Sequence, residues 1–203
     1  ILANIDKENI KFNMSIYVAS TVFGGLVGRI FSGFIATNLS YEFVFYSLSL
    51  AILVSIYFIS KLSYEGEATI SKPKITDVME ILKDKRFLII YFLMFCVFFV
   101  FSGVLNILPF RVKEISSNVS EFQISLLYLG YGMGILISLN SSKIVKFFKN
   151  ELNTILFGLI FFLFITIFLI QENIIFIFLL IFLFCVGMFI VHTVITGLAN
   201  SMK

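Results

Sequence analysis

The sequence predicts an all-α protein, a polytopic bundle of transmembrane helices with six spans. Hydrophobic residues make up 60% of the 203 residues and charged residues only 13%, with a mean hydropathy of +1.05. Average soluble domains lie near 45–50% and about 25%. A soluble chain of this length could not bury so much apolar surface. The composition therefore excludes a soluble enzyme, a nucleic-acid-binding protein and a disordered chain, and it makes the lipid bilayer the expected partner of the outer surface.

Charge-free runs locate the expected spans. A helix needs about 20 residues to cross about 30 Å of hydrocarbon, and several runs of that length lie between charged residues. The runs are continuously apolar rather than alternating, which argues against a transmembrane β-barrel. The expected spans are residues 14–36, 43–61, 87–110, 123–140, 153–170 and 173–197.

The placement of basic residues predicts the orientation. Six spans put both ends of the chain on one side, and that side would carry 12 of the 15 Lys and Arg residues. The other side would carry only Arg111 and Lys113, because Arg29 falls inside the first span. Cytoplasmic loops are enriched in Lys and Arg, so we expect both ends of this segment to be cytoplasmic.

The longest polar stretch divides the chain. Residues 1–61 hold two spans, residues 62–86 form a cytoplasmic linker, and residues 87–203 hold four spans. Within the linker, Pro73 precedes a cap at Thr76 or Asp77 and an apolar periodicity, which predicts a short amphipathic helix at the membrane surface.

Small residues line two of the spans at helical spacing. Stripes of this kind let helix backbones approach closely in lipid, so we expect them to pack helices together. Tyr128 and Tyr131 flank the second stripe and are expected to pack with it. The stripes contain Gly24, Gly25, Gly28, Ser32 and Gly33 in the first span, and Gly130 and Gly134 in the fourth.

Arg29 is a charge inside the glycine-rich first span. Placing an arginine there costs at least about 3 kcal/mol, so its side chain needs a protein partner, a water-filled cavity or access to the membrane surface. One interpretation is a structural ion pair or a side chain that extends to the interface. The other is a role in substrate binding or proton coupling.

Further polar residues lie in the third and sixth spans. His192, followed by Thr193, could relay protons, or could be a neutral side chain bonded to a neighbouring backbone. Asn106 is an amide in hydrocarbon, with Ser102 one turn before it, and it needs partners in a cavity or on another helix. Both alternatives stay open for each residue.

Catalytic and metal-binding motifs are missing from the sequence. There is one His, no Asp or Glu within the spans, and no HExxH, GxSxG, Walker A or CxxC motif. We therefore expect no enzyme activity, no metal and no cofactor. Two rival hypotheses are a six-span membrane scaffold without transport activity and a membrane-embedded enzyme, the latter lacking the clustered acidic or His residues it would need.

Three motifs carry a resemblance to a known family. Gly24–Gly33 resembles the fifth-helix antiporter motif GxxxGPxxGG, with Arg29 in place of Pro and Ser32 in place of a Gly. Asn106–Arg111 resembles the end of a seventh helix, and Gly187–Thr193 resembles part of a tenth. The three motifs follow one another in the order found in the Major Facilitator Superfamily, and together they resemble its bacterial branch of efflux permeases. Ser142–Asn150 departs from the family loop, because it keeps the basic residues but lacks the Gly and Asp.

The resemblance implies a secondary active transporter of the bacterial inner membrane. It implies proton-coupled efflux of a small organic compound by alternating access between two halves. It also implies that this chain corresponds to helices five to ten of twelve, with the missing helices as partners. The candidate substrate and coupling residues are Arg29, Asn106, His192, Thr193 and Ser102.

Overall fold

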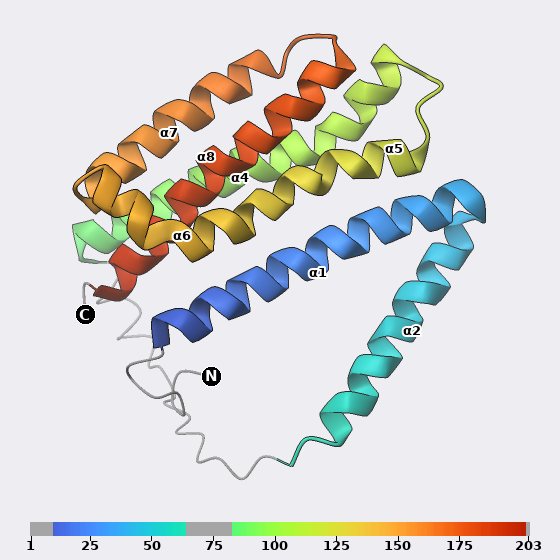
Figure 1. Cartoon of the computed structure of the whole chain (residues 1–203), viewed down its shortest axis with the longest axis horizontal. Helices are drawn as coiled ribbons and strands as arrows, with labels where there is room; N and C mark the ends of the chain where they lie inside the picture. The colour runs from blue at the N-terminus through green and yellow to red at the C-terminus, as the bar shows by residue number, and fades with distance from the viewer. Residues whose placement is uncertain (1–9, 64–82, 202–203) are drawn as a thin grey trace.

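The computed structural model describes residues 10–63 and 83–201, and within them every regular element is helical (Figure 1). Six helices or helix combinations are long and apolar enough to cross a membrane, so the all-α class and the six spans are confirmed. The elements are α1 (Ile10–Asn38), α2 (Tyr41–Ser60), α4 (Lys85–Ile115), α5 (Glu121–Leu126), the 3₁₀ helix η3 (Leu127–Gly132), α6 (Met133–Phe147), α7 (Glu151–Phe168) and α8 (Ile174–Ser201).

Each short connection between two spans makes those two spans antiparallel. Only Leu39 and Ser40 join α1 to α2, and we call this end of the molecule the hairpin end. The connections α4–α5 and α7–α8 lie at the hairpin end too, whereas the first turn of α1 and the last turn of α8 lie together at the opposite end (Figure 1). This arrangement is what an even number of crossings requires.

Side-chain caps mark the beginnings of several helices. The Asp84 carboxylate accepts a hydrogen bond from the backbone N–H of Arg86 at 2.9 Å and thereby caps α4. The Arg86 side chain also bonds this carboxylate at 2.8 Å, and these hydrogen bonds lower the pKa of Asp84. Asn150 caps α7 by accepting from the Asn153 N–H at 2.8 Å. Such caps satisfy the free N–H groups of a first turn.

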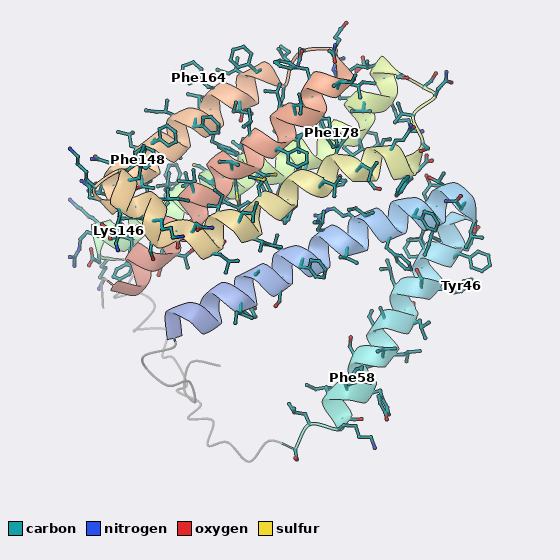
Figure 2. All side chains as sticks on the ribbon, viewed as in Figure 1. Tyr46, Phe58, Lys146, Phe148, Phe164 and Phe178 are labelled. Carbon is teal, nitrogen blue, oxygen red and sulfur yellow. The ribbon has the colours of Figure 1, made fainter. Side chains whose placement is uncertain are left out.

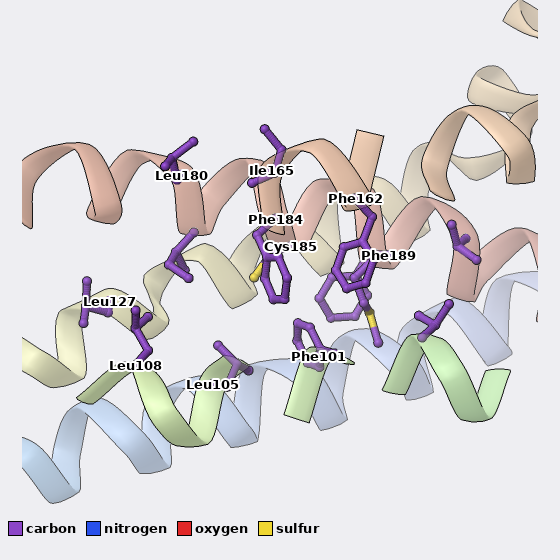
Figure 3. Close-up of a cluster of buried hydrophobic side chains, with 14 of the residues drawn as sticks. Phe101, Leu105, Leu108, Leu127, Phe162, Ile165, Leu180, Phe184, Cys185 and Phe189 are labelled. Atoms are coloured by element: carbon purple, nitrogen blue, oxygen red, sulfur yellow. The ribbon is translucent and has the colours of Figure 1, made fainter. Parts of the chain in front are cut away.

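The hydrophobic core is centred on α8, which packs against α7, α6, η3 and α4. Phe184 is fully buried and stacks on Phe101 of α4 and Phe162 of α7, with ring centroids 5.6 and 4.6 Å apart (Figure 3). Ile177 and Ile181 on the same helix are also fully buried. Because α8 is apolar on all sides, it can be enclosed by the other helices.

The first two helices lie at the edge of this core. α1 runs alongside α5, η3 and α6, whereas α2 meets α1 at the hairpin end and then diverges from it (Figure 1). α2 buries none of its residues, and Tyr46 and Phe58 project from it with 69% and 67% of their surface exposed (Figure 2). An apolar surface of this kind suits contact with lipid or with other membrane helices.

Some helix boundaries differ from the sequence prediction. α4 continues through Pro109 to Ile115, and the fourth span is interrupted by a 3₁₀ turn and continues to Phe147. Charged residues mark where the hydrocarbon would end, but a helix can continue into the aqueous layer. The amphipathic helix predicted in the linker lies outside the described residues.

Candidate functional site

A groove between α1, α2 and α5 contains Arg29. It has a volume of about 450 Å³, and its wall combines the glycines of α1 with apolar side chains of α2 and α5. The lining residues are Gly24, Gly25, Gly28, Arg29, Ser32, Gly33, Ala36, Tyr41, Val44, Leu48, Glu121, Ile124, Ser125 and Tyr128.

The guanidinium of Arg29 is held by two aromatic rings. Its Cζ atom lies 5.0 Å from the ring centroid of Tyr128 and 5.1 Å from that of Tyr131, within the range of cation–π attraction. Its Nη1 donates a hydrogen bond to the carbonyl oxygen of Gly25, one turn earlier in α1, at 3.2 Å. Within residues 10–63 and 83–201, no carboxylate forms an ion pair with Arg29.

The local winding of η3 places both tyrosines toward Arg29. In a 3₁₀ helix the side chains at i and i+3 eclipse one another, and Tyr128 and Tyr131 are three residues apart. The Tyr128 hydroxyl also donates to the carbonyl oxygen of Leu105 on α4 at 3.0 Å, which fixes its ring. From the sequence we expected these tyrosines only to pack with the neighbouring glycines. Their contact with Arg29 was not predicted. The available signal was that the two tyrosines lie three residues apart, while the first span carries an arginine that needs a partner.

The glycines fall into two groups by what surrounds them. A Cβ on Gly24 or Gly28 would meet nothing within 4 Å, so both positions leave open space. By contrast, a Cβ on Gly33 would lie 2.5 Å from the Ser125 Cβ, one on Gly130 would lie 2.9 Å from the Ile181 oxygen, and one on Gly134 would lie 2.5 Å from the Phe189 ring. The second group permits close helix contact, while the first forms the floor of the groove.

Polar contacts fix the groove at the hairpin end. The Phe122 N–H donates to Thr37 Oγ1 at 2.9 Å, which ties α1 to the first turn of α5. The Tyr41 hydroxyl donates to Glu121 Oε1 at 3.4 Å, and the same carboxylate oxygen lies 3.3 Å from Lys113 Nζ. These contacts join α1 and α2 to the four-span body of the molecule.

His192 lies on α8 against aromatic rings. Its ring contacts Phe98 and Phe189 edge-on, with centroid distances of 5.4 and 6.3 Å. Its Nδ1 atom is buried without a hydrogen-bond partner among the described residues. Thr193 turns toward α6 instead, where its hydroxyl lies 3.3 Å from that of Ser138.

An aromatic cluster links the surroundings of Arg29 and His192. Tyr131 contacts Phe101 and Phe189, with centroid distances of 5.4 and 5.6 Å, and Phe189 contacts His192. The charge on α1 and the imidazole on α8 are therefore connected through adjacent rings rather than through a hydrogen-bond chain.

Asn106 and Ser102 lie apart from these residues. Both are exposed on α4, and neither lines the groove. The structure thus places the five candidates in three locations: Arg29 in the groove, His192 and Thr193 half-buried on α8 beside the core, and Asn106 with Ser102 on an open face of α4. In the part of the chain that the structure describes, no three His, Cys, Asp or Glu residues gather as metal ligands would.

Comparison with known proteins gives one match. The family model described as Major Facilitator Superfamily matches residues 1–203, the whole sequence. No curated protein and no solved structure gives a significant match.

Proposed function

Because this chain belongs to the Major Facilitator Superfamily, whose members are membrane transporters, we propose that it exports a small organic compound by proton-coupled secondary transport. The family and the six apolar helices make it a multi-pass membrane protein of the transporter type, in contact with the bilayer and with a small-molecule substrate. Proton coupling, the outward direction and a location in the bacterial inner membrane are parts of the proposal.

Alternating access is the proposed mechanism. Two groups of helices would rock about a site near the middle of the membrane. The arrangement of α1 supports this proposal, because it lies beside α5, η3 and α6, and among its side chains that the structure describes only Val22 belongs to the core around α8. A helix held mainly along one seam can move against that seam without opening the core.

Arg29 is the proposed substrate-contacting residue. The single observation that supports it is a guanidinium exposed in a groove, stabilised by two tyrosine faces and without a carboxylate partner among the described residues. We further propose His192 as a coupling residue, because its unbonded Nδ1 could accept a proton. Asn106, Ser102 and Thr193 stay as candidate cavity residues.

The proposed orientation places both ends of this segment in the cytoplasm. Its support is the concentration of basic residues on one side of the predicted spans. The central linker, residues 62–86, would then be cytoplasmic and would separate the two groups of spans.

Transport in membrane vesicles tests the function. We would express the complete open reading frame that encodes this sequence, prepare everted vesicles and measure gradient-driven uptake from a panel of small organic compounds. We expect uptake of one class of compound that stops when the proton gradient is dissipated. Arg29→Ala should lower that uptake at least about tenfold with normal membrane levels, because an interaction in the substrate path is lost.

Arg111→Gln is the matched control for charge. It also removes one arginine, but Arg111 lies at the hairpin end and pairs with Glu114 and Glu172 at 2.8 and 3.4 Å. Its uptake should stay close to that of the unmodified protein. Gradient-independent uptake throughout the panel would refute the transport proposal, and full activity of Arg29→Ala would remove Arg29 from it.

A further inference from the structure

We infer that the groove around Arg29 binds an organic anion, with a carboxylate at the guanidinium and an apolar body between α1, α2 and α5. This inference deepens the proposed function by naming the class of substrate. It rests on that function only for what happens after binding, so its test measures binding and not transport.

The charge of the groove favours an anion. Among the described residues that line it, Arg29 is the one cation and Glu121 the one carboxylate. Glu121 is already neutralised by Lys113 at 3.3 Å and accepts a hydrogen bond from Tyr41. The positive charge of Arg29 is therefore uncompensated, and in surroundings of low dielectric such a charge attracts anions strongly and repels ammonium groups.

The geometry of Arg29 leaves room for a carboxylate. The guanidinium carries five N–H donors in a fixed planar fork, and a carboxylate can accept from two of them at once. One donor bonds the carbonyl oxygen of Gly25, and no further partner of the guanidinium edge lies among the described residues. The remaining edge can bind a carboxylate through two parallel hydrogen bonds, which are among the strongest that proteins form.

The remainder of the groove suits an apolar body of limited size. Gly24 and Gly28 leave open space along α1, so a ligand can lie directly against the backbone. Val44, Leu48 and Ile124 supply apolar walls. A volume of about 450 Å³ lies in the range of small-molecule pockets, which favours a soluble aromatic or aliphatic acid over a two-chain phospholipid as the occupant.

Benzoate is the probe for this inference. The chain would be placed in nanodiscs of zwitterionic phosphatidylcholine, and binding of radiolabelled benzoate would be measured at equilibrium. We expect saturable binding. Benzamide has the same shape without the charge and should compete at least about tenfold more weakly, because it cannot form the charge-assisted pair. Benzylamine should not compete.

Three variants assign the site. Arg29→Gln should weaken benzoate binding at least about tenfold, and Arg29→Lys should give an intermediate loss because it keeps the charge but not the two parallel bonds. Gly28→Leu keeps the charge and fills the groove, so it should also weaken benzoate binding at least about tenfold. Arg111→Gln removes an arginine elsewhere and should bind benzoate within about twofold of the unmodified chain. Circular dichroism and gel filtration of each variant verify folding.

Several results would overturn the inference. Equal competition by benzamide would show that the groove recognises only apolar surface. Equal losses in Arg29→Gln and Arg111→Gln would show attraction to net charge alone. Displacement of benzoate when phosphatidylglycerol replaces part of the phosphatidylcholine would identify a lipid as the occupant. Benzoate binding that follows these expectations without gradient-driven uptake would leave the site standing and refute the proposed transport.

Discussion

Arg29 illustrates how a single residue can carry a charge inside an apolar span. An arginine at such a position costs at least about 3 kcal/mol. A cation–π contact contributes about 0.5–2 kcal/mol, the larger value only when it is shielded from water, and Arg29 makes two, one with Tyr128 and one with Tyr131. The two rings therefore offset part of the cost of the charge without a carboxylate, and they leave the charge available to a ligand.

The coupling between Arg29 and Tyr131 can be measured with a double-mutant cycle. Tyr131 also packs on Phe101 and Phe189, so Tyr131→Leu alone would report lost packing as well as the lost ring–cation contact. Combining it with Arg29→Gln isolates the pair, and we expect a coupling free energy of about 0.5–2 kcal/mol from unfolding in detergent. Tyr131→Phe keeps the ring face and should keep most of the coupling. Additive effects of the two changes would contradict the contact.

The glycines make a second prediction at the residue scale. Gly130→Ala should lower the free energy of unfolding by about 1–3 kcal/mol, because its Cβ would lie 2.9 Å from the Ile181 backbone, which cannot shift without moving α8. Gly24→Ala is the matched control, since its Cβ would meet nothing within 4 Å. Thermal unfolding in detergent compares them. Equal destabilisation by both changes would be inconsistent with the close contact at Gly130.

At the scale of the element, η3 is the segment that builds the site. The sequence predicts one uninterrupted helix across the fourth span, but Leu127–Gly132 winds as a 3₁₀ helix between α5 and α6. A 3₁₀ stretch inside a longer helix often marks a hinge or a strained region. Here its consequence is geometric: it aligns Tyr128 and Tyr131 toward α1.

The bond between Thr37 and the Phe122 N–H should control the stability of the junction between α1 and α5. Thr37→Val keeps the shape of the side chain and removes the acceptor of that N–H, which costs about 0.5–1.5 kcal/mol because the bond is exposed and water can replace it. We expect faster amide hydrogen exchange in the peptide that contains Phe122, measured by mass spectrometry. Thr166→Val is the control, because the Thr166 hydroxyl donates to the Phe162 carbonyl of its own helix and not to another helix among the described residues. Unchanged exchange in Thr37→Val would show that the bond does not hold the junction.

For the whole molecule, α2 and one side of α4 are left uncovered by the described helices. α2 buries no residue, and the side of α4 that carries Asn106 is exposed. Bare amide and hydroxyl groups are costly in hydrocarbon, so the face with Asn106 and Ser102 needs water or another polar partner. Contact with lipid alone would satisfy the Phe and Leu residues of these faces but not Asn106.

The orientation of the whole molecule can be tested by cysteine labelling. In a background without Cys96 and Cys185, Ser117→Cys lies in the exposed α4–α5 connection, and Ser142→Cys is exposed near the opposite end of the bundle. We expect a membrane-impermeant maleimide added to intact cells to label Ser117→Cys only, because the basic residues predict that connection to be outside. Labelling of Ser142→Cys alone would reverse the orientation, and disrupted cells serve as the positive control.

The sequence by itself determined the membrane class and the six spans. These features depend on the hydrophobicity of each segment taken alone, because the bilayer acts on one span at a time. It also identified Arg29 as a candidate site residue. A charged residue within an apolar span is costly in the bilayer, and this can be recognised without knowing which side chains surround it.

Only the tertiary structure decided what surrounds that charge. The rotation of each helix about its axis, and hence the partners of its side chains, depends on how all the helices pack together. That packing brought Tyr128 and Tyr131 to Arg29, left Gly24 and Gly28 open, and closed Gly130 against α8. The periodicity of one span does not specify these relations, because the same stripe of small residues can face either a neighbouring helix or an open groove.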